Sequence, residues 1–490
     1  MHTHARLLLA VIWLFTAIKV FAYDLAYHED ISHRALLQLN FTGDARRLVS
    51  NYNMAVDIKV NTAGLILDYL RKEHYDDRFR FSEHKALRDL MLADLSRLGR
   101  LDCSDDDDLY TFAAAVGLMH HAFQDFYVHS NHTEVTSLTL DGRGLPYSFP
   151  TFDDVLQPAQ GLDGLKAAWL ADVERDVAEA LISGAYFTSP PDILDPNGDP
   201  KLLHHDILNK DKAAGAGDYL YASRANRALM HQRSTRVATR EMLVLDQKLR
   251  AVNGGCRDTL REYEFGILEQ AWQTTKRLLL KAAGSTFGHW RSGSFVFEGD
   301  ELRITITVPS VYPDSPPATK KTWTYEVENL GLEPIRLLRV SGDTPLQAGE
   351  VPAVQGWNAA RRGDDLEWTA SPGDEIAPGA KQTFEVLPAR NAVPGYVQMT
   401  TDTGHHASQL VGPVTPDWFD ASFLRAAALL ADLDEKEVLD DAGIPPSSRD
   451  PPFVPRDGKA SKGYSTVLFW GALIVVAVVA FAAGRRRTVR

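Results

Sequence analysis

The segment HHAFQDFYVHSNH, residues 120–132, places four histidines and one aspartate within thirteen positions. It closes a run rich in Ala, Leu and Phe, residues 109–128, that predicts a helix with Ser104 and an acidic run as cap and dipole partners. A helix advances about 100° per residue. One narrow stripe of such a helix therefore carries His121, Asp125, His129 and His132, whereas His120 points elsewhere.

This polar stripe predicts metal binding. Imidazole nitrogens and carboxylate oxygens four residues apart are ligands that a divalent transition metal takes from one helix. At about 1.5 Å per residue the stripe is about 16 Å long, so several ions bind along it or some members bind none. The alternative is a buried polar seam whose histidines are satisfied by hydrogen bonds. Three histidines and one aspartate on a single stripe favour the metal.

Apolar segments near both ends of the chain predict export and anchoring. Residues 1–22 have the pattern of a secretory signal peptide, and cleavage after its last residue makes Tyr23 the mature N-terminus. Residues 464–484 predict a transmembrane helix, and the basic tail, residues 485–490, remains cytoplasmic by the positive-inside rule. We expect a single-pass membrane protein whose bulk is extracytoplasmic, in the periplasm or at the cell surface.

Cysteine content bears on the compartment of the protein, and net charge bears on its possible substrates. A disulfide between Cys103 and Cys256 fits an exported protein, but their spacing leaves open whether they pair. The formal net charge of −13 argues against an electrostatic grip on nucleic acid. A local cluster of metal cations would reverse that sign at the site itself.

Apolar periodicity predicts a multi-domain chain that begins with a mainly α-helical domain, residues 23–290. Apolar positions recur there at three- and four-residue spacing, which predicts helices over residues 28–39, 63–71, 84–98, 109–128, 162–182, 222–249 and 259–283.

The period changes to two near residue 294, as in Ile304, Ile306 and Val308. We expect an antiparallel β-sandwich of immunoglobulin-like size over residues 294–411, acting as a spacer or as a module that binds a protein or glycan partner. Residues 412–463 predict an acidic helix followed by a Pro-rich linker.

Histidines and acids also gather in four further segments of the helical part, and eleven of the 16 histidines lie between His28 and His231. These segments are residues 23–31, Asp57, residues 73–77 and residues 204–211. Each alone fits a capping or surface role. Together they supply the mixture of imidazole and carboxylate that a multi-zinc hydrolytic site uses.

The order of these segments resembles the superfamily of zinc-dependent phospholipases C and fungal single-strand nucleases. The similarity is closest to the heterokaryon-incompatibility C protein branch and spans residues 23–249. Residues 121–131 are similar to that branch's His-x-x-x-Asp-Phe-x-x-His-Ser-Asn signature. Its opening segment, its His-Phe-Asp motif and its His-Gly-Gly-Ile-Asn-Lys-Asp motif resemble residues 27–32, 74–77 and 205–211.

This resemblance implies an all-α fold around up to three zinc ions. The first would be held by the amine and carbonyl of Tyr23 with His28, the second by Asp57, His74 and His121, with Asp125 as a bridge. The third would be held by His129 and His205. Further ligands or neighbours of the ions would come from His132, Glu134, His204, Asn209, Lys210 and Asp211. If residues 1–22 stay attached as an anchor, the first zinc lacks its amine ligand.

The resemblance also implies hydrolysis of phosphate esters by metal-bound hydroxide, with Asp57 and Asp125 as the catalytic carboxylates. The membrane tether and the acidic composition favour phospholipid over nucleic acid as substrate. Two alternatives stay open: a non-catalytic surface protein whose metals brace the helical domain, and a single-strand nuclease.

Overall fold

The computed structural model describes residues 23–59, 81–141, 151–152, 178, 181, 224–287, 293–299, 301–308, 322–341, 354–362, 365–386, 393–414, 417–441, 444 and 449–451. Predictions that lie outside these residues are the signal peptide, the transmembrane helix 464–484 with its tail, the helix 63–71, most of the helix 162–182, and His74, His204, His205, Asn209, Lys210 and Asp211. Within the described ranges, no helix has both the length and the apolar character needed to cross a membrane.

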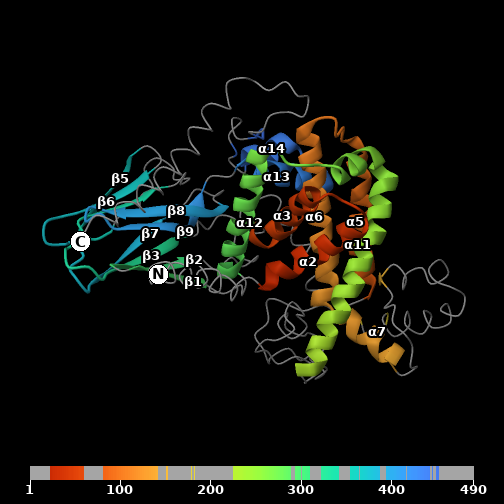
Figure 1. Cartoon of the computed structure of the whole chain (residues 1–490), viewed down its shortest axis with the longest axis horizontal. Helices are drawn as coiled ribbons and strands as arrows, with labels where there is room; N and C mark the ends of the chain where they lie inside the picture. The colour runs from red at the N-terminus through yellow and green to blue at the C-terminus, as the bar shows by residue number, and fades with distance from the viewer. Residues whose placement is uncertain are drawn as a thin grey trace, which may run out of the picture. The chain divides into compact units, whose positions relative to one another are not determined.

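A helical region comes first, as predicted (Figure 1). Its elements are α2 (Tyr23–Gln38), α3 (Gly43–Lys59), α5 (Phe81–Asp94), the 3-10 helix η1 (Leu95–Arg100), α6 (Asp106–His129), α7 (His132–Asp141), α11 (Arg224–Arg261) and α12 (Ile267–Phe287). The predicted helix 259–283 is divided, because α11 runs to Arg261 and α12 begins at Ile267. Helix α3 was not predicted from apolar periodicity, since buried asparagines at Asn51 and Asn53 interrupt its apolar face.

Helix α6 is the central element, and every residue of its run from Leu109 to His129 is buried. Its N-cap is Asp105, not the predicted Ser104, because the Asp105 carboxylate accepts the backbone N–H of Asp107. The backbone becomes extended at Ser130, and α7 starts at His132. The predicted stripe is therefore wrong at its far end, since His132 lies on the next helix.

Helix α6 approaches α3 very closely at Gly117. A Cβ atom there would lie 2.6 Å from the Cβ of Tyr52, 2.8 Å from the backbone nitrogen of Asn53 and 2.9 Å from the carbonyl oxygen of Val49. Only glycine fits this crossing. Because His121 follows Gly117 by one helical turn, the crossing sets the distance from α3 to the stripe.

A buried polar cluster joins helices α5, α6 and α11. Arg88 on α5 forms an ion pair with Glu241 on α11, and both side chains are 1% exposed. The hydroxyl of Tyr127 on α6 donates to Glu241 at 2.8 Å and accepts the backbone N–H of Phe152 at 2.8 Å. Because each buried polar group here has a partner, the cluster fixes these helices together instead of destabilising them.

A disulfide joins Cys103 to Cys256, across 153 residues of chain. It ties the loop before α6 to the point where α11 departs from helical geometry, at Asn253. The side-chain amide of Asn253 donates to the carbonyl oxygens of Leu98 and Leu101 at 2.9 and 3.0 Å, which supports the same junction.

Antiparallel sheets follow the helical region, as predicted. The described strands are β1 (Gly293–Glu298), β2 (Leu302–Val308), β3 (Trp323–Asn329), β4 (Leu337–Ser341), β5 (Trp357–Arg362), β6 (Asp365–Ala370), β7 (Lys381–Val386), β8 (Val393–Thr401) and β9 (His406–Val414). They form two sheets of order β1-β2-β3-β7 and β5-β6-β4-β8-β9. Both sheets contribute to one apolar core, where the rings of Trp368 and Phe384 lie 5.2 Å apart.

Two helices, α13 (Trp418–Ala431) and α14 (Glu435–Asp441), occupy the segment predicted as one acidic helix. Helix α13 is largely buried, and its rings pack on helices from the first part of the chain. The Phe419 ring stacks on Tyr52 of α3 at 4.1 Å, and Trp418 lies 4.7 Å from Trp272 of α12. The helical core therefore includes a segment that follows the strands.

The Gly117→Ala substitution should destabilise the protein. The added methyl group overlaps backbone and Cβ atoms that cannot move independently, at a cost of about 1–3 kcal/mol. Urea unfolding measures this loss. Gly43→Ala on α3 is the matched control, because its nearest neighbour is the guanidinium of Arg46 at 3.7 Å. Equal stability of the two variants would contradict the close crossing.

Removing the disulfide with a Cys103→Ala and Cys256→Ala double substitution should lower the free energy of unfolding by about 2–5 kcal/mol, because the unfolded chain gains freedom. Thermal unfolding of the oxidised wild type and the double variant provides the comparison. Reduced wild-type protein should unfold close to the variant. An unchanged midpoint in the double variant would show that the link does not stabilise the fold.

Candidate metal centre

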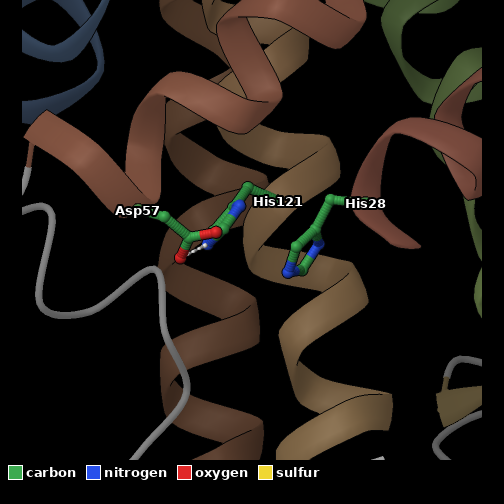
Figure 2. Close-up of side chains that lie close together, drawn as sticks. All are labelled: His28, Asp57 and His121. Atoms are coloured by element: carbon green, nitrogen blue, oxygen red, sulfur yellow. Dashed lines mark ion pairs between the residues drawn. The ribbon is translucent and has the colours of Figure 1, made fainter. Parts of the chain in front are cut away.

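Three side chains from three helices meet in the interior of the helical region. They are His28 of α2, Asp57 of α3 and His121 of α6, and one ligand atom from each lies within 4.8 Å of the others. Figure 2 shows the His121 ring between the Asp57 carboxylate and the His28 ring. The side chains of His28 and His121 are 3% and 0% exposed, whereas that of Asp57 is 24% exposed. Solvent therefore reaches this group from the Asp57 side.

Asp125 lies one turn after His121 on α6 and contacts both imidazoles. Its Oδ2 lies 3.1 Å from Nε2 of His121, and its Oδ1 lies 3.2 Å from Nε2 of His28. Its Oδ1 is also 3.8 Å from Nε2 of His129, the next predicted member of the stripe. One fully buried carboxylate thus joins imidazoles from α2 and from two turns of α6.

These separations suit a small divalent ion. Four ligands with bonds of about 2.0–2.2 Å in a tetrahedron lie about 3.3–3.6 Å from one another. The Nε2 of His121 is 3.4 Å from Oδ1 of Asp57, and the two contacts of Asp125 are slightly shorter. Imidazole nitrogen with carboxylate oxygen is a donor set that several first-row metals accept, so these residues do not select one metal.

Burial and charge set the protonation states that a metal site needs. Burial lowers the pKa of His121, against the raising effect of the Asp125 and Asp57 carboxylates. Burial alone would raise the pKa of Asp125, but the imidazoles of His121, His129 and His28 outweigh it and hold that pKa well below its usual value. Both directions are those that metal binding requires, because a ligand imidazole is neutral and a ligand carboxylate is ionised.

Two amide side chains beside the imidazoles were not recognised from the sequence as part of the site. Oδ1 of Asn53 lies 3.1 Å from Nδ1 of His121, and Oε1 of Gln124 lies 2.8 Å from Nδ1 of His28. The sequence indicated this role for Asn53 through its spacing. Asn53 precedes Asp57 by one turn of α3 and therefore lies on the same face of that helix. Contacts to the ring nitrogen that does not bind metal orient histidine ligands.

Other predicted residues lie elsewhere. His120 points away from the carboxylates, as expected, and its Nδ1 lies 3.0 Å from the hydroxyl of Ser32. His132 packs against the rings of Phe126 and Tyr127, 5.3 and 5.2 Å away. Glu134 is buried in the first turn of α7.

The structure brings together ligands that were predicted for two different ions. His28 was assigned to a first ion with Tyr23, the first residue of α2, and Asp57 with His121 to a second. In the described part of the chain, His28, Asp57 and His121 lie together in one candidate site. The packing of three helices, which local patterns do not encode, decides this grouping.

No protein-family model, curated protein or solved structure matches this chain. The resemblance to zinc-dependent phospholipases C therefore stays a prediction from the motifs.

His121→Ala should abolish metal binding, because it removes a ligand that contacts both Asp57 and Asp125. The measurement is metal content per chain after equilibration with Zn²⁺ and removal of free ion. His84→Ala is the matched control, since His84 is equally buried but packs against the ring of Phe126. Equal metal content in both variants would contradict the site.

Proposed function

We propose that this chain is an exported, membrane-anchored, zinc-dependent phosphoric diester hydrolase that acts on phospholipid head groups in the manner of a phospholipase C. The observation that carries the proposal is the meeting of His28, Asp57 and His121 beside the Asp125 carboxylate. The predicted motif order and the predicted membrane span add to it. The proposal includes His74, His129 and His205 as ligands of further zinc ions.

A bound divalent ion would supply an activated water and positive charge for phosphate oxygens. The chain's own residues define where a substrate enters. His28, His121 and Asp125 are buried, so their positions are fixed and a substrate does not reach them from solvent directly. Asp57 alone among the three grouped side chains is partly exposed, so a phosphate ester approaches on its side and its carboxylate orients the attacking water.

Charge favours lipid over nucleic acid as the substrate. The net charge of −13 repels a polyanion, whereas one phosphodiester in a head group carries a single negative charge. The predicted anchor at residues 464–484 would hold the site near a bilayer. Single-stranded nucleic acid is therefore the second choice of substrate.

The burial of the site favours a second function, a non-catalytic surface protein braced by metal. Asp125 and His121 are 0% exposed, and an ion held among such groups stabilises a fold without meeting a substrate. In that case the paired sheets would carry the binding function. The two functions differ in turnover, not in metal content.

Zinc-loaded full-length protein should hydrolyse phosphatidylcholine in mixed micelles, with release of phosphocholine as the measurement. Single-stranded DNA should be cleaved more slowly or not at all. Asp57→Asn should lower turnover by roughly 100-fold or more, since removing an orienting general base costs about 10²–10⁴. His33→Ala is the control, because His33 is exposed. Full metal loading without turnover on either substrate would replace the hydrolase with the metal-braced protein.

A further inference from the structure

Two buried amide side chains connect the candidate imidazole ligands through the ring nitrogens that face away from the carboxylates. Asn53 meets Nδ1 of His121, and Gln124 meets Nδ1 of His28. Nδ2 of Asn53 lies 3.2 Å from Oε1 of Gln124, so the two amides form one chain. Both amides are 0% exposed, so hydrogen bonds within the protein decide their orientation.

A backbone carbonyl decides which way Asn53 faces. Nδ2 of Asn53 lies 3.3 Å from the carbonyl oxygen of His28 and 2.7 Å from the hydroxyl of Ser32. Because a carbonyl oxygen only accepts hydrogen bonds, the NH₂ group of Asn53 must face it. Oδ1 of Asn53 then faces His121, and Nδ1 of His121 must carry the proton.

The orientation of Gln124 follows from that of Asn53. Since Nδ2 of Asn53 donates, Oε1 of Gln124 accepts, and its NH₂ group donates to the hydroxyl of Ser32 at 2.9 Å. Oε1 also faces Nδ1 of His28, so that nitrogen carries a proton too. The carbonyl oxygen of His28 thus determines the protonated nitrogen of two imidazole rings.

The opposite arrangement shows why this carbonyl matters. With both amides reversed, the ring nitrogens would still find partners, but the single O–H of Ser32 would face two amide oxygens, at 2.7 and 2.9 Å. The oxygen of Asn53 would then face the His28 carbonyl oxygen with no proton between them, and buried acceptors without a donor are strongly penalised. The carbonyl oxygen of His28 and the single proton of Ser32 therefore both favour the first arrangement.

We propose that Asn53 and Gln124 are positioning residues that hold His28 and His121 in the tautomer protonated at Nδ1. This inference deepens the proposed function and rests on its metal centre. The Nε2 lone pair of His28 then faces Asp125 at 3.2 Å, and that of His121 faces both Asp125, at 3.1 Å, and Asp57, at 3.4 Å. Acceptors facing one another at these distances form a site prepared for a cation.

The packing of the two rings agrees with neutral imidazoles. The ring centroids of His28 and His121 lie 4.3 Å apart in a stacked arrangement. Two imidazolium ions at that separation in the protein interior would repel strongly. A shared cation beside both Nε2 atoms needs no charge on either ring.

The test reads tautomers directly in the metal-free full-length protein labelled with ¹⁵N-histidine. Ring ¹⁵N shifts and long-range couplings distinguish the two tautomers, and His28→Gln and His121→Gln spectra assign the signals. Both rings should be protonated at Nδ1 in the wild type. Asn53→Ala should move His121 to the tautomer protonated at Nε2, and Gln124→Ala should move only His28. Zinc affinity should fall roughly 10- to 100-fold in each variant.

Asn51→Ala is the matched control. Asn51 lies on the same helix, is equally buried, and donates to Oε1 of Gln273 at 2.8 Å, away from the site. It should change neither tautomer nor zinc affinity. Protonation at Nε2 of either ring in the wild type, or an unchanged His121 in Asn53→Ala, would overturn the inference. Expected tautomers without zinc binding would remove the proposed function and leave the role of the amides in place.

Discussion

The approach of α6 to α3 at Gly117 is the constraint on which the candidate centre depends. Aspartate and histidine have short side chains with few rotatable bonds, so their meeting distance is set by the separation of the helices that carry them. With Tyr52 and Val49 against the bare Cα of Gly117, the next turn of each helix brings Asp57 to His121. The absence of a side chain at Gly117 thus allows Asp57 and His121 to meet.

The second feature is a polar seam inside a fully buried helix. Helix α6 is buried from Leu109 to His129, yet it carries His121, Gln124 and Asp125 on its inner face. Buried polar groups lower stability unless they are hydrogen-bonded. The side-chain amides of Asn53 and Gln124 hydrogen-bond to the Nδ1 atoms of the two rings. The Nε2 atoms of the rings face carboxylate oxygens. Such a local conflict inside an otherwise satisfied core is typical of a functional site.

Long-range links keep this core together. The bond between Cys103 and Cys256 holds the entry of α6 to α11, and α13 returns after the strands to stack Phe419 on Tyr52. Tyr52 also forms part of the surface against which Gly117 lies. The segment that follows the sheets therefore supports the same helix crossing that positions the candidate ligands, although it supplies none of them.

The sequence by itself determined the features that repeat within a few residues. A period near four marked most helices, and a period of two marked the strands. The helical period also placed His121 and Asp125 on one face. Tertiary structure alone decided the rest: α3 as a helix, His132 off the stripe, the pairing of the cysteines, and the amide contacts 68 and 96 residues away from their imidazoles. Local patterns record which side chains share a face. Which faces meet depends on helix packing, here on a single glycine far along the chain from Asp57.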